Sequence, residues 1–275
     1  MAGATRRAPA RSRGGRGTVR PSVAKLVGTV ALAVACASCA GGPPPLASGP
    51  TIPAAGRPVV YAALGASETA GTGLNDTSLR ARYAWPQLFF NAALPRAATY
   101  YNFAVPGTTT EAALREEVPP ALAVHPGIVT VFFSIDDLVQ GVSPTTFGTN
   151  LDAIVHAMRQ GGRARVLVGN APAIDTLPAF LACRGVSFEG VHCPVLAGVT
   201  IPPTQAVDAA VSAYDAAIAA VVAREGATLV DLRAHSDQIT AHPEDVAPDG
   251  LHPSPLGDQM IARLFATAFE VKRAG

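Results

Sequence analysis

The sequence predicts an α/β domain in which a central parallel sheet is covered by helices on both faces. Five short apolar runs rich in β-branched residues have the length of strands buried on both faces, and segments of helical periodicity lie between them. Such alternation is typical of parallel sheets. The 275 residues are 49% hydrophobic and 15% charged, which is enough for one sizeable core but not for two large domains.

The N-terminal segment does not belong to this core. The first 50 residues carry seven Lys or Arg and no acid, with the apolar run LVGTVALAVA at residues 26–35 followed by CASCAGGPPP. A basic region, a short apolar run and small residues are typical of an export signal, and the run is about half of the ~20 residues that a spanning helix needs. We expect an export signal peptide at 1–39, a Pro/Gly-rich linker at 40–57 and the folded domain at 58–275.

Most of the positive charge lies in that leader. Without its seven cations, 14 of the 21 Lys and Arg remain against 20 Asp and Glu, so the folded part has a net charge near −6. A surface of this sign lacks the basic footprint of a nucleic-acid-binding protein. We therefore expect no nucleic-acid partner.

The four cysteines form two pairs. Ala-Ser-Cys39-Ala-Gly-Gly resembles a bacterial lipobox, with Cys36 at a position more usually occupied by Leu. The protein is accordingly expected to be exported, and either secreted or anchored to the outer face of the cell membrane as a lipoprotein through a lipidated Cys39. Cys183 and Cys193 are ten residues apart. In an exported protein this favours a disulfide over metal ligation, with two free thiols as the alternative.

The expected elements follow one another along the domain. The predicted strands are residues 58–64, 98–104, 128–134, 164–170 and 227–232. Helical stripes are formed by Phe147, Leu151, Ile154, Val155 and Met158, by Val207, Val211, Tyr214, Ile218, Val221 and Val222, and by Leu256, Ile261, Leu264, Phe265 and Phe269. Ligands bind beyond the carboxyl ends of the strands in such sheets, so functional residues should directly follow each run.

Two turns with small residues follow the first and second predicted strands. The first, LGASETAG, contains Ser67 among glycines. A serine on a tight strand-to-helix turn can present its hydroxyl together with backbone N–H groups, which suits a nucleophile that also holds an oxyanion, although a helix cap would look the same. The second turn contains Gly107, which allows close backbone approach, and residues 108–110 with Glu111 form a candidate capping box.

Acidic residues mark two later segments. Asp136 and Asp137 directly follow the third predicted strand, where a metal site, a general acid/base pair and a solvated turn are all open. Asp249 stands three residues before His252 in a Gly/Pro-rich turn ahead of the last helix. A carboxylate at this spacing can accept a hydrogen bond from one ring nitrogen and leave the other as a base, which is the orienter and base half of a serine hydrolase triad.

The order of these blocks resembles the GDSL, or SGNH, esterase and lipase family. The blocks are GAS at 65–67, Gly107, SIDD at 134–137 and DGLHP at 249–253, and the resemblance runs through residues 58–270. It implies a flavodoxin-like three-layer α/β/α sandwich with a central parallel sheet.

The resemblance also implies a role for each matching residue. Ser67 corresponds to the nucleophile, His252 to the base and Asp249 to its orienter. The backbone N–H groups of Ser67 and Gly107 correspond to two oxyanion donors. No metal and no organic cofactor is implied.

Two blocks depart from the family pattern. Ala66 and Glu68 replace the Asp and Leu of the family name, and neither change removes the nucleophile. Asp136 replaces the Asn that donates a side-chain N–H to the oxyanion, and an ionised carboxylate can only accept hydrogen bonds. Losing one such donor typically costs ~10²- to 10³-fold in kcat. Asp136 is therefore expected to be protonated, to turn away, or to mark a protein that has lost catalysis and kept the fold.

The leading functional prediction is an exported, monomeric serine esterase or lipase that hydrolyses small-molecule or lipid esters through an acyl-enzyme at Ser67. The alternative is a weakened or inactive protein of this fold that binds a glycan, lipid or acyl ligand. A divalent metal site of Asp136, Asp137 and His252 is a third reading, disfavoured because adjacent residues on extended backbone point to opposite faces. Apolar residues of the 171–203 loop either line an acyl site or form a small core of their own. They are Leu177, Phe180, Leu181 and Phe188.

Overall fold

The computed structural model of the chain describes residues 58–74, 76–187, 190–191, 193 and 201–271. All of these belong to one compact unit, Pro53–Gly275. The expected signal peptide at 1–39 with Cys39, the linker at 40–57 and Phe188 lie outside the described residues.

Five parallel strands form the sheet, and each coincides with a predicted apolar run. They are β1 (Val60–Gly65), β2 (Thr99–Asn102), β3 (Ile128–Phe132), β4 (Arg165–Gly169) and β5 (Thr228–Val230). The order is β2-β1-β3-β4-β5, with every neighbouring pair parallel, as in flavodoxin-like sheets. Strands β1, β3 and β4 are almost entirely buried, whereas β2 is a largely exposed edge.

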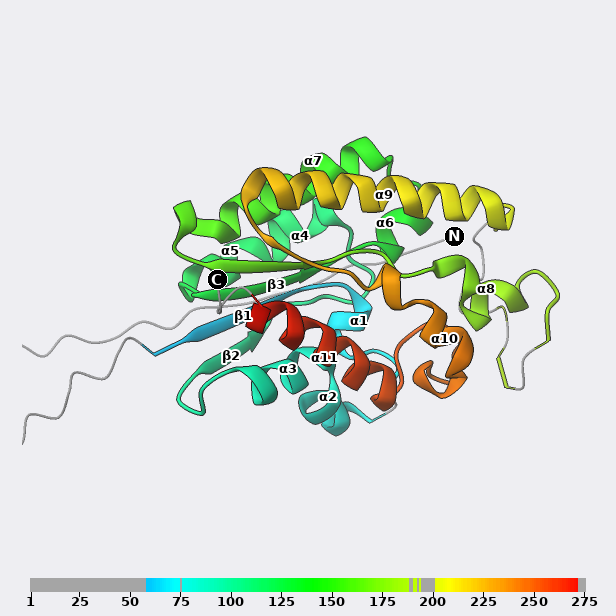
Figure 1. Cartoon of the computed structure of the whole chain (residues 1–275), viewed down its shortest axis with the longest axis horizontal. Helices are drawn as coiled ribbons and strands as arrows, with labels where there is room; N and C mark the ends of the chain where they lie inside the picture. Colours follow the sequence, from blue (N-terminus) through cyan, green and yellow to red (C-terminus); the bar gives the residue numbers. More distant parts are fainter. Residues whose placement is uncertain (1–57, 75, 188–189, 192, 194–200, 272–275) are drawn as a thin grey trace, which may run out of the picture. The chain divides into compact units, whose positions relative to one another are not determined.

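Helices cover both faces of this sheet, which confirms the predicted three-layer α/β/α sandwich (Figure 1). One face carries α4 (Thr110–Glu116), α5 (Val118–Ala123), α7 (Pro144–Arg159) and α9 (Thr204–Glu225). The other carries α2 (Thr77–Tyr83), α3 (Trp85–Ala93) and α11 (Pro255–Val271). Shorter elements are α1 (Ser67–Ala70), α6 (Ile135–Val139), α8 (Pro178–Ala182), α10 (Asp237–Ala241) and the 3-10 turns η1 (Gln160–Gly162), η2 (Ile174–Thr176), η4 (Arg233–His235) and η5 (Pro243–Asp245).

Each face of the sheet has its own core. The predicted stripe on α7 is buried against one face, together with Tyr214, Ile218 and Val221 of α9 and side chains of α4 and α5. Val222 of the α9 stripe is only partly buried there. On the other face the core is aromatic, and Trp85 of α3 stacks on Phe265 of α11 with 4.3 Å between ring centroids. Leu256, placed by its periodicity in the stripe of α11, is instead 47% exposed, because Gly257 and Asp258 are the buried residues of that first turn.

Helix α9 is the one element in the described part of the chain that is long and apolar enough to cross a membrane by length and composition. It packs along α7 and against β5, with Tyr214, Ile218 and Val221 buried in the shared core, whereas Val207 and Val211 are buried at the carboxyl end of the sheet. The core helix of a soluble domain meets the same criterion, so this feature is weak evidence for a membrane span.

The segment after β4 builds a third, smaller core at the carboxyl end of the sheet. Leu177 and Phe180 are buried there against Ile135 of α6 and Val207 of α9, and Leu181 packs on them half-buried. The small core accounts for these three residues, and Leu177 and Phe180 also line apolar cavities, as the other reading of the loop expects. The structure also joins Cys183 to Cys193 in the predicted disulfide, with 4.6 Å between the Cα atoms.

Candidate functional site

Four segments meet beyond the carboxyl ends of the strands. The short helices α1, α6, α8 and α10 all lie at this end of the sheet (Figure 1). Ser67 is the first residue of α1, directly after β1, and Asp136 and Asp137 belong to α6, directly after β3. His252 lies between η5 and α11. The topology thus brings the predicted site residues to one edge.

The turn that carries Ser67 depends on Gly65. Its φ is +156°, and a Cβ there would collide with the Thr69 side chain and the Phe132 carbonyl oxygen. Ser67 is only 8% exposed. Helix α1 is preceded by Ala66 as its N-cap residue and has no side-chain cap hydrogen bond, so the reading of Ser67 as a helix cap is wrong. The Ser67 hydroxyl instead donates to Glu68 Oε2 at 3.3 Å.

Asp249 and His252 form a hydrogen-bonded pair. His252 Nδ1 is 2.7 Å from Asp249 Oδ2, and Asp249 Oδ1 accepts the backbone N–H groups of Leu251 and His252 at 2.9 and 3.0 Å. Gly250 makes this turn at φ +75°, where an added Cβ would lie 2.8 Å from the Ala179 nitrogen. With Nδ1–H donating to the carboxylate, Nε2 is the ring nitrogen that can accept a proton.

The pair also fixes the charge states of its members. Burial raises the pKa of Asp249, but the hydrogen bonds from His252 and Leu251 outweigh it and leave the pKa below its usual value. For His252, burial lowers the pKa. The Asp249 hydrogen bond and the carboxylates of Glu68 and Asp136 raise it by more, so the pKa of His252 lies above its usual value.

Asp137 links two helices. It is 1% exposed, and its carboxylate accepts the Thr110 backbone N–H at 2.9 Å and the Thr110 hydroxyl at 2.6 Å. Both acids of the pair lie in the first turn of α6, so they do not stand on the extended backbone assumed from sequence. Their side chains nevertheless point in different directions. Asp137 is hydrogen-bonded to Thr110, so it is not available as a metal ligand beside Asp136 and His252. Among the residues that the structure describes, no group of three or more His, Cys, Asp or Glu is arranged to hold a metal.

Asp136 faces the other way, into the site. Its Oδ2 is buried and has no hydrogen-bond partner. Burial, together with the nearby carboxylates of Glu68 and Asp137, raises the pKa of Asp136 to about 7, and His252 acts in the opposite direction. A substantial share of Asp136 is therefore protonated at neutral pH and able to donate a hydrogen bond.

Gly107 lies in the exposed turn before α4. Its φ is +81°, and an added Cβ would meet no atom within 4 Å, so the space beside it is open. Thr109 is the N-cap of α4 and accepts the Ala112 N–H at 3.3 Å. The predicted cap is thus present, but the capping box with Glu111 is wrong, because Glu111 pairs with Arg115 at 2.7 Å instead.

Three buried acids near the site were not singled out from the sequence. Glu68 is 7% exposed with Oε1 unpartnered, Glu117 is fully buried and accepts the Gly65 N–H at 2.9 Å, and Asp258 accepts the Trp85 N–H at 2.9 Å. Burial raises the pKa of Glu117 and of Asp258 to about 8 each. Only Glu68 carried a sequence signal, as the acid that replaces the Leu of the family name.

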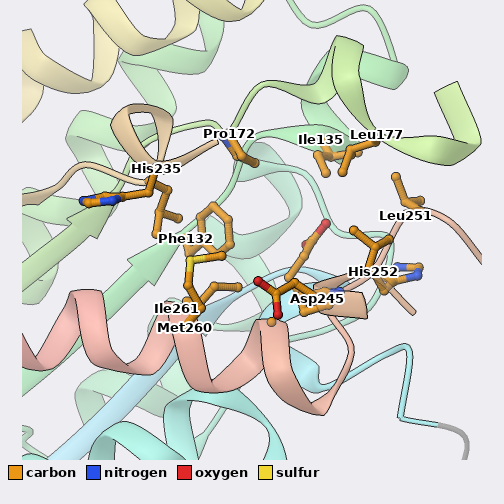
Figure 2. Close-up of a pocket in the computed structure, with 15 residues that line it drawn as sticks. Phe132, Ile135, Pro172, Leu177, His235, Asp245, Leu251, His252, Met260 and Ile261 are labelled. Carbon is orange, nitrogen blue, oxygen red and sulfur yellow. The ribbon is translucent and has the colours of Figure 1, made fainter. Parts of the chain in front are cut away.

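Apolar cavities flank the site. One is bounded by His252 and Glu68 and lined mainly by hydrophobic side chains from β3, α6 and α11 (Figure 2). A second, lined by α6, α8 and α9, shares two residues with the first, Ile135 and Leu251. These two shared residues are next to site residues in the sequence, since Ile135 precedes Asp136 and Leu251 precedes His252.

Similar folds are known among solved structures. The lipase/acylhydrolase from Enterococcus faecalis matches with a TM-score of 0.57 at 21% identity, covering 78% of this chain and 96% of that chain. The psychrotrophic esterase EstA from Pseudoalteromonas sp. matches with a TM-score of 0.56 at 16% identity, covering 78% of this chain and 99% of that chain. The extracellular lipase from Streptomyces rimosus matches with a TM-score of 0.54 at 18% identity, covering 76% of this chain and 99% of that chain. At these identities the likeness concerns the fold.

A comparison with curated protein sequences returns no match. The model of the GDSL-like lipase/acylhydrolase family, by contrast, matches residues 63–260, which include all four sequence blocks. The chain therefore belongs to the GDSL-like lipase/acylhydrolase family.

Proposed function

We propose that the protein is a serine esterase that hydrolyses carboxylic esters through an acyl-enzyme at Ser67. The observation that carries this proposal is the Asp249–His252 pair, joined at 2.7 Å, at the same sheet edge as a serine on a glycine-dependent turn. Gly73, which follows α1, packs on the histidine, since an added Cβ would lie 2.8 Å from His252 Cβ. The serine and histidine segments are therefore in contact.

The reaction follows from these positions. His252 Nε2 takes the Ser67 hydroxyl proton while Oγ bonds to the ester carbonyl carbon, and Asp249 stabilises the resulting imidazolium. The imidazolium then returns that proton to the leaving alkoxide as the ester C–O bond breaks. Water, deprotonated by His252, attacks the acyl-enzyme and releases the acid and free Ser67. The hydroxyl must first turn from Glu68 to His252, and such bonds often tighten only when substrate is bound.

The oxyanion would form against the backbone N–H groups of Ser67 and Gly107. We include Asp136 as a third donor in its protonated form. Its buried, unpartnered Oδ2 and its pKa near 7 support this role, because a neutral carboxylic acid can donate as the family's amide does.

The two apolar cavities support an ester with an apolar acyl or alcohol group. Export is part of the proposal and is supported by the basic leader and the Cys183–Cys193 disulfide, which suits an oxidising compartment. Anchoring through Cys39 and a monomeric state remain predictions from sequence.

The decisive experiment compares wild type with Ser67→Ala on p-nitrophenyl esters of increasing chain length. Hydrolysis should fall by ~10³-fold or more, and a fluorophosphonate probe should label only the wild type. Ser212→Ala is the matched control, because Ser212 is exposed on α9. Equal hydrolysis by wild type and Ser67→Ala would reject the esterase. Failure of the probe to label wild type would favour a binding protein.

A further inference from the structure

Glu68 contacts the nucleophile candidate directly. Its Oε2 accepts the Ser67 hydroxyl at 3.3 Å, its side chain is 7% exposed, and its Oε1 is buried without a hydrogen-bond partner. Leaving a buried polar atom unsatisfied destabilises the folded state, and more so for a charged group. The family name has an apolar Leu at this position, which would avoid that cost. The carboxylate thus has no evident structural reason to be there.

We propose that Glu68 is a further catalytic residue, which holds the Ser67 hydroxyl in the resting enzyme, stabilises the imidazolium that His252 forms during the reaction and keeps Asp136 a hydrogen-bond donor. This inference rests on the esterase activity proposed above. It assigns a role to a residue for which the family resemblance implies none.

Packing fixes Glu68 beside the imidazole. Glu68 and His252 line the same cavity. The turn after α1 holds the two segments together, because Gly73 leaves no room for a side chain against His252. A carboxylate held at this place acts on the imidazole through a poorly solvated medium, where charges interact more strongly than in water.

Ionisable groups from several segments surround Glu68. Asp136 of α6, His252 of the turn before α11 and Asp258 of α11 interact with its charge, and Asp245 of η5 and His235 of η4 line the same cavity. Of these, the carboxylate of Glu68 raises the pKa of His252, of Asp136 and of Asp258.

These interactions define what Glu68 does in the reaction. In the resting enzyme it orders the Ser67 hydroxyl. When the proton moves from Ser67 to His252, the imidazolium gains a second carboxylate besides Asp249. Glu68 simultaneously opposes ionisation of Asp136, which keeps that group a hydrogen-bond donor. No step of the proposed reaction transfers a proton to or from Glu68.

The test is the pH dependence of kcat/KM for Glu68→Gln across about pH 5 to 9. The amide keeps the size of the side chain and removes its charge. Both pH limits should then move to lower pH, each by roughly one unit, because the imidazolium loses a stabilising carboxylate and Asp136 loses a repelling one. The coupled groups report two apparent pKa values, and the inference concerns their common direction. A purely structural role would lower activity equally at all pH values.

Three variants complete the design. Glu68→Asp keeps the charge and should keep both limits within a few tenths of a unit. Glu225→Gln makes the same chemical change at the end of α9. This residue lies ahead of the amino end of β5, away from the carboxyl ends that carry the site, so the pH profile should be unchanged. Glu68→Leu introduces the family's residue and gives the same test if the amide variant does not fold.

The outcomes separate this inference from the proposed function. If Ser67→Ala hydrolyses esters like wild type, the esterase proposal itself fails. If Ser67→Ala is inactive but Glu68→Gln and Glu68→Leu keep both pH limits of wild type, only the role of Glu68 is overturned. A shift of both limits in the acid direction, absent from Glu68→Asp and Glu225→Gln, supports it.

Discussion

Asp136 is the residue whose protonation has the largest expected effect on the proposed reaction. Burial and neighbouring carboxylates raise its pKa to about 7, so its donor capacity is lost as pH rises through that value. The productive form combines a protonated Asp136 with a neutral His252, although the imidazole has a raised pKa. Part of the enzyme at neutral pH is then in the opposite arrangement, with the proton on the histidine and the carboxylate ionised.

We therefore predict that Asp136→Asn raises esterase activity on the alkaline side. An amide donates at every pH, so kcat at about pH 9 should increase at least tenfold, as expected when a lost oxyanion donor is restored. Near pH 5, where Asp136 is protonated, the two proteins should differ much less. Parallel pH profiles for wild type and Asp136→Asn, measured with one p-nitrophenyl ester, would exclude Asp136 as a donor.

At this scale the sequence was informative where chemistry depends on short spacing. Asp249 and His252 are three residues apart, and their hydrogen bond follows from that turn. The surroundings of Asp136 do not follow in this way, because Glu68 and His252 come from distant segments and meet it only through the fold. The interactions of Glu68 with His252, Asp136 and Asp258 were missed for the same reason, since all three are distant from it in sequence.

At the scale of elements, α4 and α6 are joined through one carboxylate. The two hydrogen bonds from Thr110 end on Asp137, and both residues are almost fully buried. Each helix follows a strand that contributes to the site, so this link sets how the Gly107 turn and Asp136 lie relative to each other. The sequence predicted the start of α4 but neither α6 nor the connection between the two helices, which joins positions 27 residues apart.

We predict that Asp137→Asn destabilises the domain by ~2 kcal/mol, because the amide accepts only through one oxygen and leaves a buried N–H group without an acceptor. Thr110→Val removes the hydroxyl partner and should cost less. Chemical unfolding of both single variants and the double variant would show coupling, with the double variant less destabilised than the sum. Strict additivity would mean that the two side chains do not act together.

At the scale of the whole molecule, buried acids make stability depend on pH. Glu117 lies under the β1 turn and Asp258 opens α11 against α3, and burial raises the pKa of each to about 8. In the unfolded chain these groups titrate near their ordinary values of ~4. Between about pH 4 and 8 the folded state therefore holds protons that the unfolded state releases, so stability falls as pH rises and levels off above 8.

The fold itself was predictable because its signals are repeated many times. Five apolar runs and three amphipathic stripes each report the same alternation, and an error such as the exposed Leu256 does not change the outcome. Single buried carboxyls such as Glu117 and Asp258 have no such redundancy. In the sequence they look like any surface acid, and only the packed structure shows that they are buried.

The last prediction concerns Glu117. Replacing it with Gln removes one ionisable group and retains an acceptor for the Gly65 N–H, so the pH dependence of unfolding should become shallower. With one pKa unit worth ~1.4 kcal/mol, we expect the variant to gain about 3 to 4 kcal/mol relative to wild type between about pH 5 and pH 8. Urea unfolding at both pH values measures this, with the exposed Glu111→Gln as control. An unchanged slope in Glu117→Gln would mean that Glu117 ionises in the folded protein at its ordinary pKa, and that the turn holding Ser67 rests on a charged rather than a neutral carboxyl group.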